Sequence, residues 1–382
     1  MARGFIVKRG EAYRIGVELP PDPTTGKRQR HWETFHGTKK EADKRLTELQ
    51  GFVDRGRLGA NSKMILADFL DLWLEQHAET KAAKTSLRYH QIVQHQLKPH
   101  LGRVRLDLLT PAVISGLDKK LRAQNLAPQT RQHAYRVLHT ALNYALTLRL
   151  IVTHPMDGLQ APSVPKKEMQ VFDVAEARRF LDTCRTAQLQ RWTDADRLKW
   201  LAFFSVALNT GMRVSELRGL RWQDVDYEAS ELRVRQNALR IPKVGWVRKS
   251  TKTSGSVRSI SIDATLLDML NRHQAEVMKL RILSPKFADY DLVFPSEAGT
   301  PLEDRRIHYV FKHLCELAGV KKIRPYDLRH CCATLLLSAG VNPKVVQERL
   351  GHASVTLTLQ TYSHVLPNIQ KDAAQTLGKL LG

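Results

Sequence analysis

The 382-residue sequence lacks the features of a membrane, secreted or zinc-binding protein. No uninterrupted apolar run reaches the roughly 18 residues that span a membrane, and the first ten residues carry charge but no apolar signal segment. Cysteine is scarce, and no Cys-x-x-Cys pair or Cys/His set has zinc spacing. No internal repeat, low-complexity tract or carboxylate cluster for a metal is present. We therefore expect a cytoplasmic protein without membrane, metal or cofactor, in which four cysteines are reduced thiols: Cys184, Cys315, Cys331 and Cys332.

Negative charge is also sparse relative to positive charge. Lys and Arg total 60 against 38 Asp and Glu, a net charge of +22, and the excess is spread along the whole chain. Positive charge distributed over several folded segments indicates a long polyanion that all of them contact. Nucleic acid is the expected partner, although composition alone also fits a generally basic protein without one.

Apolar periodicity divides the first part of the chain into two domains. Residues 1–60 show alternation typical of three strands, followed by a helix that Thr38 and Glu41 open as a capping box. Residues 63–160 show the helical period throughout. We predict a small sheet-and-helix binding module followed by an all-helical domain.

A proline-punctuated linker at 161–170 precedes a third domain at 171–382. There, helical stretches alternate with strand-like stretches at 231–235, 244–251 and 257–262. We expect the last two strands to form a hairpin whose turn is flanked by Lys252 and Arg258. The predicted fold class is mainly α with small β-sheets (α+β).

The C-terminal region places a tyrosine, histidines and an arginine in one short stretch. Arg329 opens one predicted helix, Gly351 ends the next, and His352 and Tyr362 follow. These residue types can form a nucleophile with anion-binding support. The same stretch also fits an ordinary helix junction, or the turn of a DNA-binding helix-turn-helix in a repressor-like protein.

Five motifs in a fixed order favour the catalytic interpretation of this stretch over the other two. They are Thr-Gly-x-Arg-x-x-Glu-Leu at 210–217, Lys-Thr-x-x-Ser-x-Arg at 252–258, Tyr-x-x-Arg-His at 326–330, Leu-Gly-His at 350–352, and Tyr362. Their order and spacing resemble those of the tyrosine recombinases, the phage integrase family. The resemblance covers 171–382 by motif. By layout it extends to a helical core-binding domain and an N-terminal arm-binding domain.

The resemblance implies a role for each matching residue: Tyr362 as nucleophile, Arg213 and Arg329 as phosphate clamp, Lys252 as general acid and His352 as a further donor. The chemistry agrees, because guanidinium groups suit bidentate contact with phosphate oxygens. A phenol with a pKa near ~10 also needs neighbouring cations or a base to become a nucleophile at neutral pH.

Three neighbours are candidates for supporting roles. Tyr326 stands where the family usually has a histidine, which leaves proton handling open, and His330 is a possible substitute. We interpret Glu216, beside Arg213, as orienting the site. Expected DNA contacts, each equally explained as an ordinary surface or ion-pair residue, are Lys81, Lys84, Arg88, Lys119, Arg131 and Arg258.

The resemblance implies a site-specific recombinase or integrase that cleaves DNA through a 3′-phosphotyrosyl intermediate, without metal or ATP. The N-terminal module favours a phage or integrative element. Expected partners are double-stranded DNA at core and arm-type sites, further copies of the chain in a tetramer, and a host bending factor or excision factor. A relaxing topoisomerase of type IB chemistry, and an inert repressor or architectural protein, are the alternatives. An amphipathic helix is predicted after Pro367. It could pack on its own domain, or, as the resemblance implies, dock on a neighbouring copy during assembly.

Overall fold

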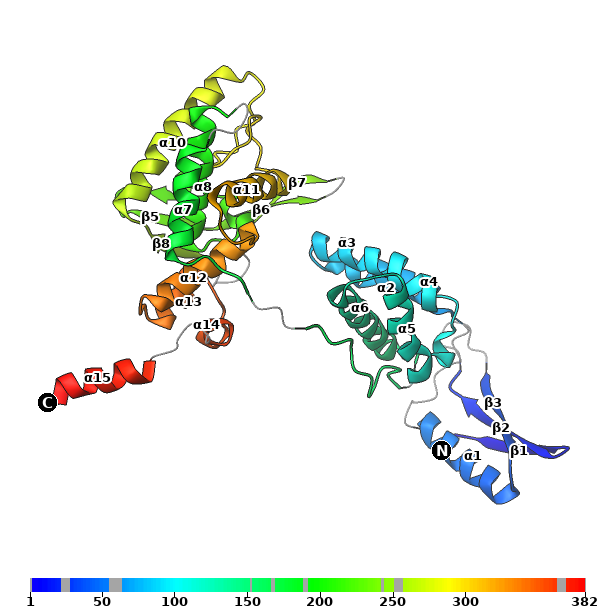
Figure 1. The fold of residues 1–382 in the computed structure, drawn as a ribbon. Helices are drawn as coiled ribbons and strands as arrows, with labels where there is room; N and C mark the ends of the chain where they lie inside the picture. The colour runs from blue at the N-terminus through cyan, green and yellow to red at the C-terminus, as the bar shows by residue number, and fades with distance from the viewer. Residues whose placement is uncertain are drawn as a thin grey trace. The chain divides into compact units, whose positions relative to one another are not determined.

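A computed structural model describes most of the chain, and the elements below are its helices and strands (Figure 1). The chain divides into two compact units, Met1–Lys167 and Glu168–Gly382, which we describe separately. The described residues are 2–21, 28–54, 64–151, 153–165, 169–187, 192–241, 244–250, 257–362 and 369–381.

The first unit begins with the predicted three-stranded sheet and helix. The strands are antiparallel in the order β1-β2-β3, and one helix follows them. Their bounds are β1 (Gly4–Arg9), β2 (Ala12–Leu19), β3 (Gln29–His36) and α1 (Lys39–Asp54).

One face of this sheet packs on α1. Ile15 and Val17 of β2 are fully buried, and Ala42 of the helix is buried with them. The predicted capping box is confirmed, because the Thr38 amide donates to a Glu41 carboxylate oxygen at 2.8 Å and the Glu41 amide donates to the Thr38 hydroxyl at 3.4 Å.

From α2 to α6 the first unit consists mainly of helices. Trp73 and Phe69 are fully buried in its core, and the Trp73 ring stacks on Tyr89 with centroids 5.2 Å apart. The elements are α2 (Leu66–Gln76), η1 (Ala78–Thr80), α3 (Ala83–Ile92), η2 (Val93–Leu97), α4 (Lys98–Leu101), η3 (Leu106–Leu108), α5 (Pro111–Ala123) and α6 (Pro128–Thr147).

The second unit is built around one helix, α8 (Asp194–Thr210), which is buried continuously from Lys199 to Leu208 and packs against α7, α10 and α12. Phe180, Phe204 and Phe311 form an aromatic cluster beside it, with neighbouring centroids 5.1 to 5.4 Å apart. The other helices are α7 (Val174–Thr186), α9 (Val214–Leu217), η4 (Trp222–Asp224), α10 (Ala264–Leu283), α11 (Asp304–Ala318), η5 (Pro325–Asp327), α12 (Leu328–Ser338), α13 (Pro343–Leu350), α14 (Val355–Tyr362) and α15 (Ile369–Leu381).

The strands of this unit correct one sequence prediction. The expected hairpin between 244–251 and 257–262 does not form, because the two strands belong to different sheets. Strand β7 (Gly245–Ser250) pairs with β6 (Gln236–Ile241), whereas β8 (Arg258–Ser261) pairs with β5 (Glu231–Val234), which also pairs with β4 (Val225–Asp226). Lys252 and the expected turn lie outside the described residues.

A small satellite core joins α12, α13 and α14. It consists of Ala333, Leu337, Val346, Leu350 and Tyr362. Val346 and Leu350 of α13 are therefore buried, whereas Val345 of the same helix is half exposed.

The fold class is confirmed as mainly helical with small antiparallel sheets. The predicted C-terminal helix is also present as α15, and its Leu377 and Leu380 are exposed. No helix among the described residues is long and apolar enough to cross a membrane.

Candidate active site

The first arginine of the site follows a sharp break in the chain. α8 ends at Gly211, whose φ of +63° favours glycine, and an added Cβ there would lie 2.5 Å from a methyl group of Leu350. Two residues later, Arg213 caps α9 and donates from Nη1 to the Glu216 carboxylate at 2.7 Å. The break therefore fixes the direction from which Arg213 enters the site.

Glu216 is a buried carboxylate shared by two arginines. Its side chain is 2 % exposed, and Arg258 donates to it from Nη2 at 3.0 Å while Arg213 holds the other oxygen. Burial by itself would raise the pKa of Glu216, but Arg258 and Arg213 together hold that pKa below its ordinary value. Glu216 is thus an ionised group that orients both guanidinium groups.

Arg258 connects three segments that are distant in sequence. It lies on β8, binds Glu216 of α9, and donates from Nε to the Arg349 carbonyl oxygen at 2.7 Å. Its side chain also packs against Gly351, where φ is +68° and an added Cβ would lie 3.1 Å from the Arg258 Cδ. The side chain is only 6 % exposed, so Arg258 lies within the cluster around Glu216.

Arg329 is a buried cation whose hydrogen-bonding capacity is only partly used. It lies in the first turn of α12, is 8 % exposed, and donates from Nη1 to the Gly211 carbonyl oxygen at 2.9 Å. Its buried Nη2 has no partner among the described residues. Burial and the nearby Arg213 lower the pKa of Arg329 to about 10, which still leaves it charged at neutral pH.

His352 faces the same cluster from the segment after α13. Its Nδ1 and the Thr358 hydroxyl share a hydrogen bond of 2.8 Å, which leaves Nε2 as the ring nitrogen available to a ligand. Burial, Arg329 and Arg213 lower the pKa of His352 to about 4. The ring is therefore neutral at pH 7, and only its Nε2–H tautomer could donate to an anion while Nδ1 accepts from Thr358.

Tyr362 ends α14 with a fully buried side chain. Its hydroxyl and Nδ1 of His330 share a hydrogen bond of 2.6 Å. Burial raises the pKa of Tyr362 to about 12, opposed by Arg329, and burial also lowers the pKa of His330. Burial therefore makes the phenol a weaker acid and the imidazole a weaker base, so the proton stays on the phenol in this arrangement.

Tyr326 lies apart from the hydrogen bonds described above. It is on η5, is 42 % exposed, and has Asp304 and Arg218 as charged neighbours. Burial, followed by the charge of Asp304, raises the pKa of its phenol. Lys252 lies outside the described residues.

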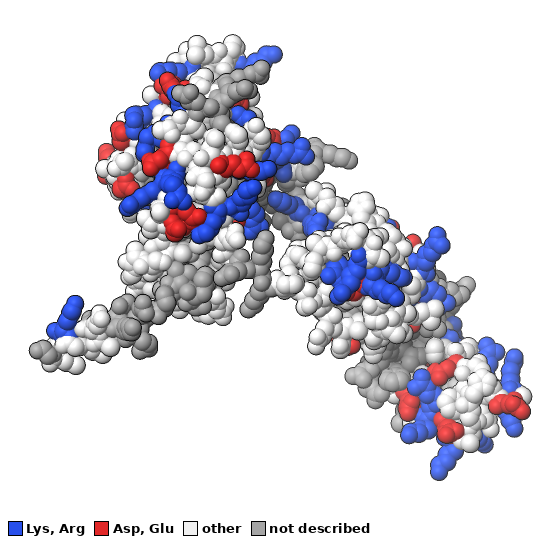
Figure 2. All heavy atoms as spheres, in the orientation of Figure 1, with Lys and Arg blue, Asp and Glu red and all other residues white. Residues whose placement is uncertain are grey.

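The expected DNA contacts of the helical domain separate into two groups. Arg131 is buried and paired with Asp118 at 2.6 Å, so the structure makes it an ion pair between α6 and α5 instead of a surface contact. The others have exposed side chains: Lys81, Lys84, Arg88 and Lys119. Lys and Arg side chains are spread over the face shown in Figure 2, interspersed with fewer acidic ones.

Sequence reasoning missed two supports of the site. Thr358, which fixes the His352 ring, lies four residues before Tyr362 and therefore on the same side of α14. The Asn209 carbonyl oxygen accepts from both Arg349 (2.8 Å) and the Cys332 thiol (3.5 Å). Helical spacing could have indicated Thr358, but a backbone carbonyl leaves no mark in a sequence.

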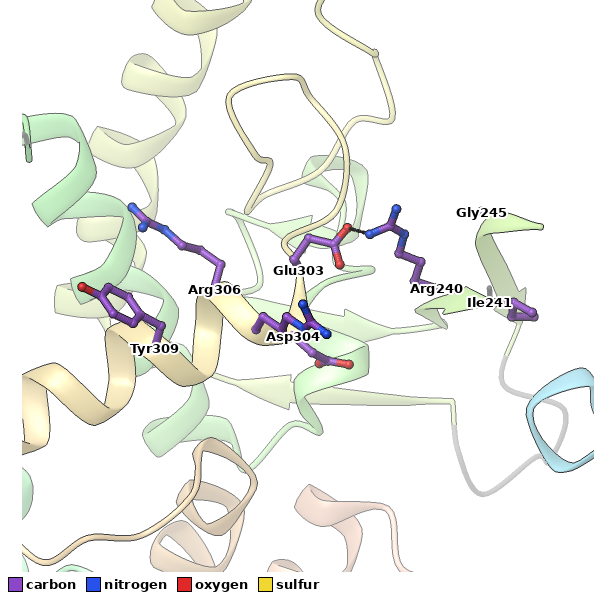
Figure 3. A pocket seen from close by; sticks show the side chains of 8 residues that line it. Arg240, Ile241, Gly245, Glu303, Asp304, Arg306 and Tyr309 are labelled. Carbon is purple, nitrogen blue, oxygen red and sulfur yellow. Dashed lines mark hydrogen bonds and ion pairs between the residues drawn. The ribbon is translucent and has the colours of Figure 1, made fainter. Parts of the chain in front are cut away.

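A separate hollow lies between the β6–β7 hairpin and the start of α11 (Figure 3). Its walls carry both charges, and Arg240 and Glu303 form an ion pair there. None of the motif residues lines it. Nowhere among the described residues do three or more His, Cys, Asp or Glu side chains gather as a metal site would require.

Comparison with known proteins agrees with this geometry. Residues 170–368 match the model of the phage integrase family, and residues 65–122 match a phage integrase N-terminal SAM-like domain. A tyrosine recombinase XerC-like protein of Caldanaerobacter subterraneus subsp. tengcongensis is 28 % identical over 98 % of both chains.

Solved structures show the same fold. The Tn1549 transposon integrase, in complex with a circular intermediate DNA, matches with a TM-score of 0.70 and 21 % identity, covering 82 % of this chain and 99 % of that one. A lambda integrase tetramer bound to a Holliday junction matches with a TM-score of 0.55 and 16 % identity, covering 92 % and 96 %. The chain belongs to the phage integrase family and is a tyrosine recombinase, an enzyme that cleaves and rejoins DNA strands.

Proposed function

We propose that the cluster around Glu216 binds the scissile phosphodiester of DNA, and that Tyr362 attacks it. The observation that carries this proposal is the unpartnered, buried Nη2 of Arg329. Two guanidinium groups bind the single carboxylate of Glu216, and the charge of Arg329 acts on the same cluster, so the cluster has an uncompensated positive charge that an anion would neutralise. A phosphodiester supplies that anion, and its charge increases in the transition state.

The reaction then follows from the residues. The Tyr362 hydroxyl loses its proton to solvent water as its oxygen forms a bond to phosphorus, the bond to the 5′ oxygen breaks, and the DNA 3′ phosphate remains on the tyrosine. Arg213 and Arg329 stabilise the non-bridging oxygens, with His352 as an additional donor through Nε2. Lys252 gives a proton to the departing 5′ oxygen. A 5′ hydroxyl from a partner duplex reverses these steps, which returns the phenol and joins the new strands.

The N-terminal domain is proposed to bind a second, arm-type DNA site. The sheet face turned away from α1 carries Trp32, with the Arg14 guanidinium 4.8 Å from its ring centroid. Arg30 lies similarly over Phe5 at 5.3 Å. Cationic and aromatic side chains on an open sheet are suited to a nucleic-acid backbone.

The substrate class is proposed to be the DNA of a mobile element. The likeness to a transposon integrase that carries circular intermediate DNA supports integration and excision, and the likeness to a DNA-bound tetramer supports assembly of four copies. The exposed side chains Lys81, Lys84, Arg88 and Lys119 are proposed contacts of the helical domain with the core site. An inert repressor would have no need for the buried arginine cluster.

A nicked suicide duplex tests the proposal, because cleavage then releases a short strand and traps the covalent complex. Tyr362→Phe should bind this DNA but form no covalent complex, since only the attacking oxygen is lost. Tyr309→Phe is a matched control at an exposed tyrosine outside the site and should behave as the wild type. A covalent complex in the Tyr362→Phe protein would contradict the assignment.

A further inference from the structure

The proposed nucleophile is in a position from which it cannot react. Tyr362 has no exposed surface, yet attack requires its oxygen to come within about 3.5 Å of a DNA phosphorus atom. DNA cannot reach a fully buried atom. The hydroxyl must therefore leave its site among α12, α13 and α14 before the reaction begins.

Two hydrogen bonds to histidines hold the buried face of α14. Tyr362 is bonded to His330 at 2.6 Å, and Thr358, one helical turn earlier, is bonded to His352 at 2.8 Å. Both α14 side chains are fully buried, whereas Leu357 and Leu359 of the same helix are substantially exposed. One face of α14 is therefore held by the hydrogen bonds of Tyr362 and Thr358, while apolar side chains on the other face are exposed.

Proton transfer does not explain the His330 contact. The phenol in this site is a weaker acid than a free tyrosine, and the imidazole beside it is a weaker base than a free histidine, both because of burial. Burial is the largest cause of the lowered pKa of His330; Asp327 favours a charge on the ring, whereas Arg329 and Arg324 disfavour it. A short hydrogen bond between two neutral groups has a simpler consequence, which is to fix the hydroxyl in place.

We propose that His330 is a positioning residue that holds Tyr362 in a closed resting state, and that α14 must release this hydrogen bond before DNA is cleaved. The inference rests on Tyr362 being the nucleophile. It predicts that the isolated protein, or a protein on a single duplex, is restrained by the His330 contact. Contacts made on assembly must then offset its loss.

Acetylation of tyrosine by N-acetylimidazole, read by mass spectrometry at each residue, tests the resting state without DNA. In the wild-type protein, Tyr362 should react at least about tenfold more slowly than exposed Tyr309, as expected for a side chain without accessible surface. His330→Leu should bring the Tyr362 rate toward that of Tyr309, which itself should not change. His330→Asn retains a polar atom near the Nδ1 position and should preserve slow labelling. Equal labelling of the two tyrosines in the wild type would overturn the proposal even if the Leu variant failed to fold.

Cleavage separates this role from others. His330→Leu should raise covalent-complex formation on a single half-site relative to paired half-sites, and His330→Asn should restore the wild-type ratio. If the substitution only damaged the structure, both reactions would slow. If His330 were a base required for attack, both would be abolished. Either result would contradict the proposed restraint of Tyr362 by His330. Because labelling needs no DNA, it tests the restraint by His330 separately from the assignment of Tyr362 as the nucleophile.

Discussion

At the residue scale, the site contains more positive charges than negative ones. The single negative charge of Glu216 balances one arginine, so the remaining positive charge is available to attract a phosphate. Arg329 is the clearest case, because it is buried and donates to a backbone oxygen instead of a carboxylate. A buried cation without a carboxylate is costly in the free protein, which is consistent with a group kept for a ligand.

We expect Arg329→Ala and Arg213→Ala each to reduce cleavage of bound DNA by about 10²-fold or more, the usual cost of losing one preorganised donor to a developing charge. Single-turnover cleavage at saturating DNA measures this effect apart from affinity. Arg240→Ala, which removes an exposed arginine outside the cluster, is the control. Loss of affinity with unchanged cleavage of bound DNA would reduce the two arginines to positioning contacts.

At the element scale, Arg258 holds β8, α9 and the end of α13 together through Glu216 and the Arg349 carbonyl oxygen. We expect Arg258→Lys to keep the charge but lose the forked geometry, because an ammonium group cannot replace a planar guanidinium. The maximal cleavage rate should fall by more than about tenfold with DNA affinity little changed. Arg235→Lys, at a partly exposed arginine before β6, is the matched control. An affinity loss as large as the rate loss would favour the direct DNA contact that the sequence suggested.

Sequence patterns predicted the elements better than their partners. Strand-like alternation located β7 and β8, but alternation does not specify which strands pair, so a hairpin was wrongly expected between them. The motifs indicated Arg213, Arg329 and Tyr362 as candidates. The contact between Tyr362 and His330 spans 32 residues, and depends on how α12 and α14 pack, which periodicity does not encode.

At the scale of the whole molecule, the N-terminal domain and the C-terminal helix are two parts outside the chemical site. The sheet and α1 have their own small core, which ends before α2 begins. We therefore expect deletion of residues 1–60 to leave cleavage of a core-site suicide duplex within about twofold of the wild type while strongly reducing integration between two full sites. Parallel assays of the two reactions measure this difference. Loss of core cleavage would mean that these residues belong to the catalytic machinery.

The C-terminal helix α15 leads to the last prediction, because three of its leucines are exposed. Leu377, Leu380 and Leu381 are 56 %, 75 % and 83 % exposed. The sequence left open whether this helix packs on its own domain or on another copy, and exposed leucines favour another copy. In a ring of identical subunits such a contact would be head-to-tail and would close on itself.

Truncation after Asn368 removes α15 and should barely change binding to a single half-site. Cooperative binding to paired half-sites and recombination should both fall, because each tail would no longer reach its neighbour. Mobility-shift titrations with one and two half-sites measure the cooperativity directly, and Leu377→Asp with Leu380→Asp in the full-length chain is a matched variant that leaves the tail in place. Both proteins should show the same loss if the apolar face makes the contact. Unchanged cooperativity in both would exclude the tail from assembly, whereas aggregation of the truncated protein alone would indicate that α15 covers its own domain.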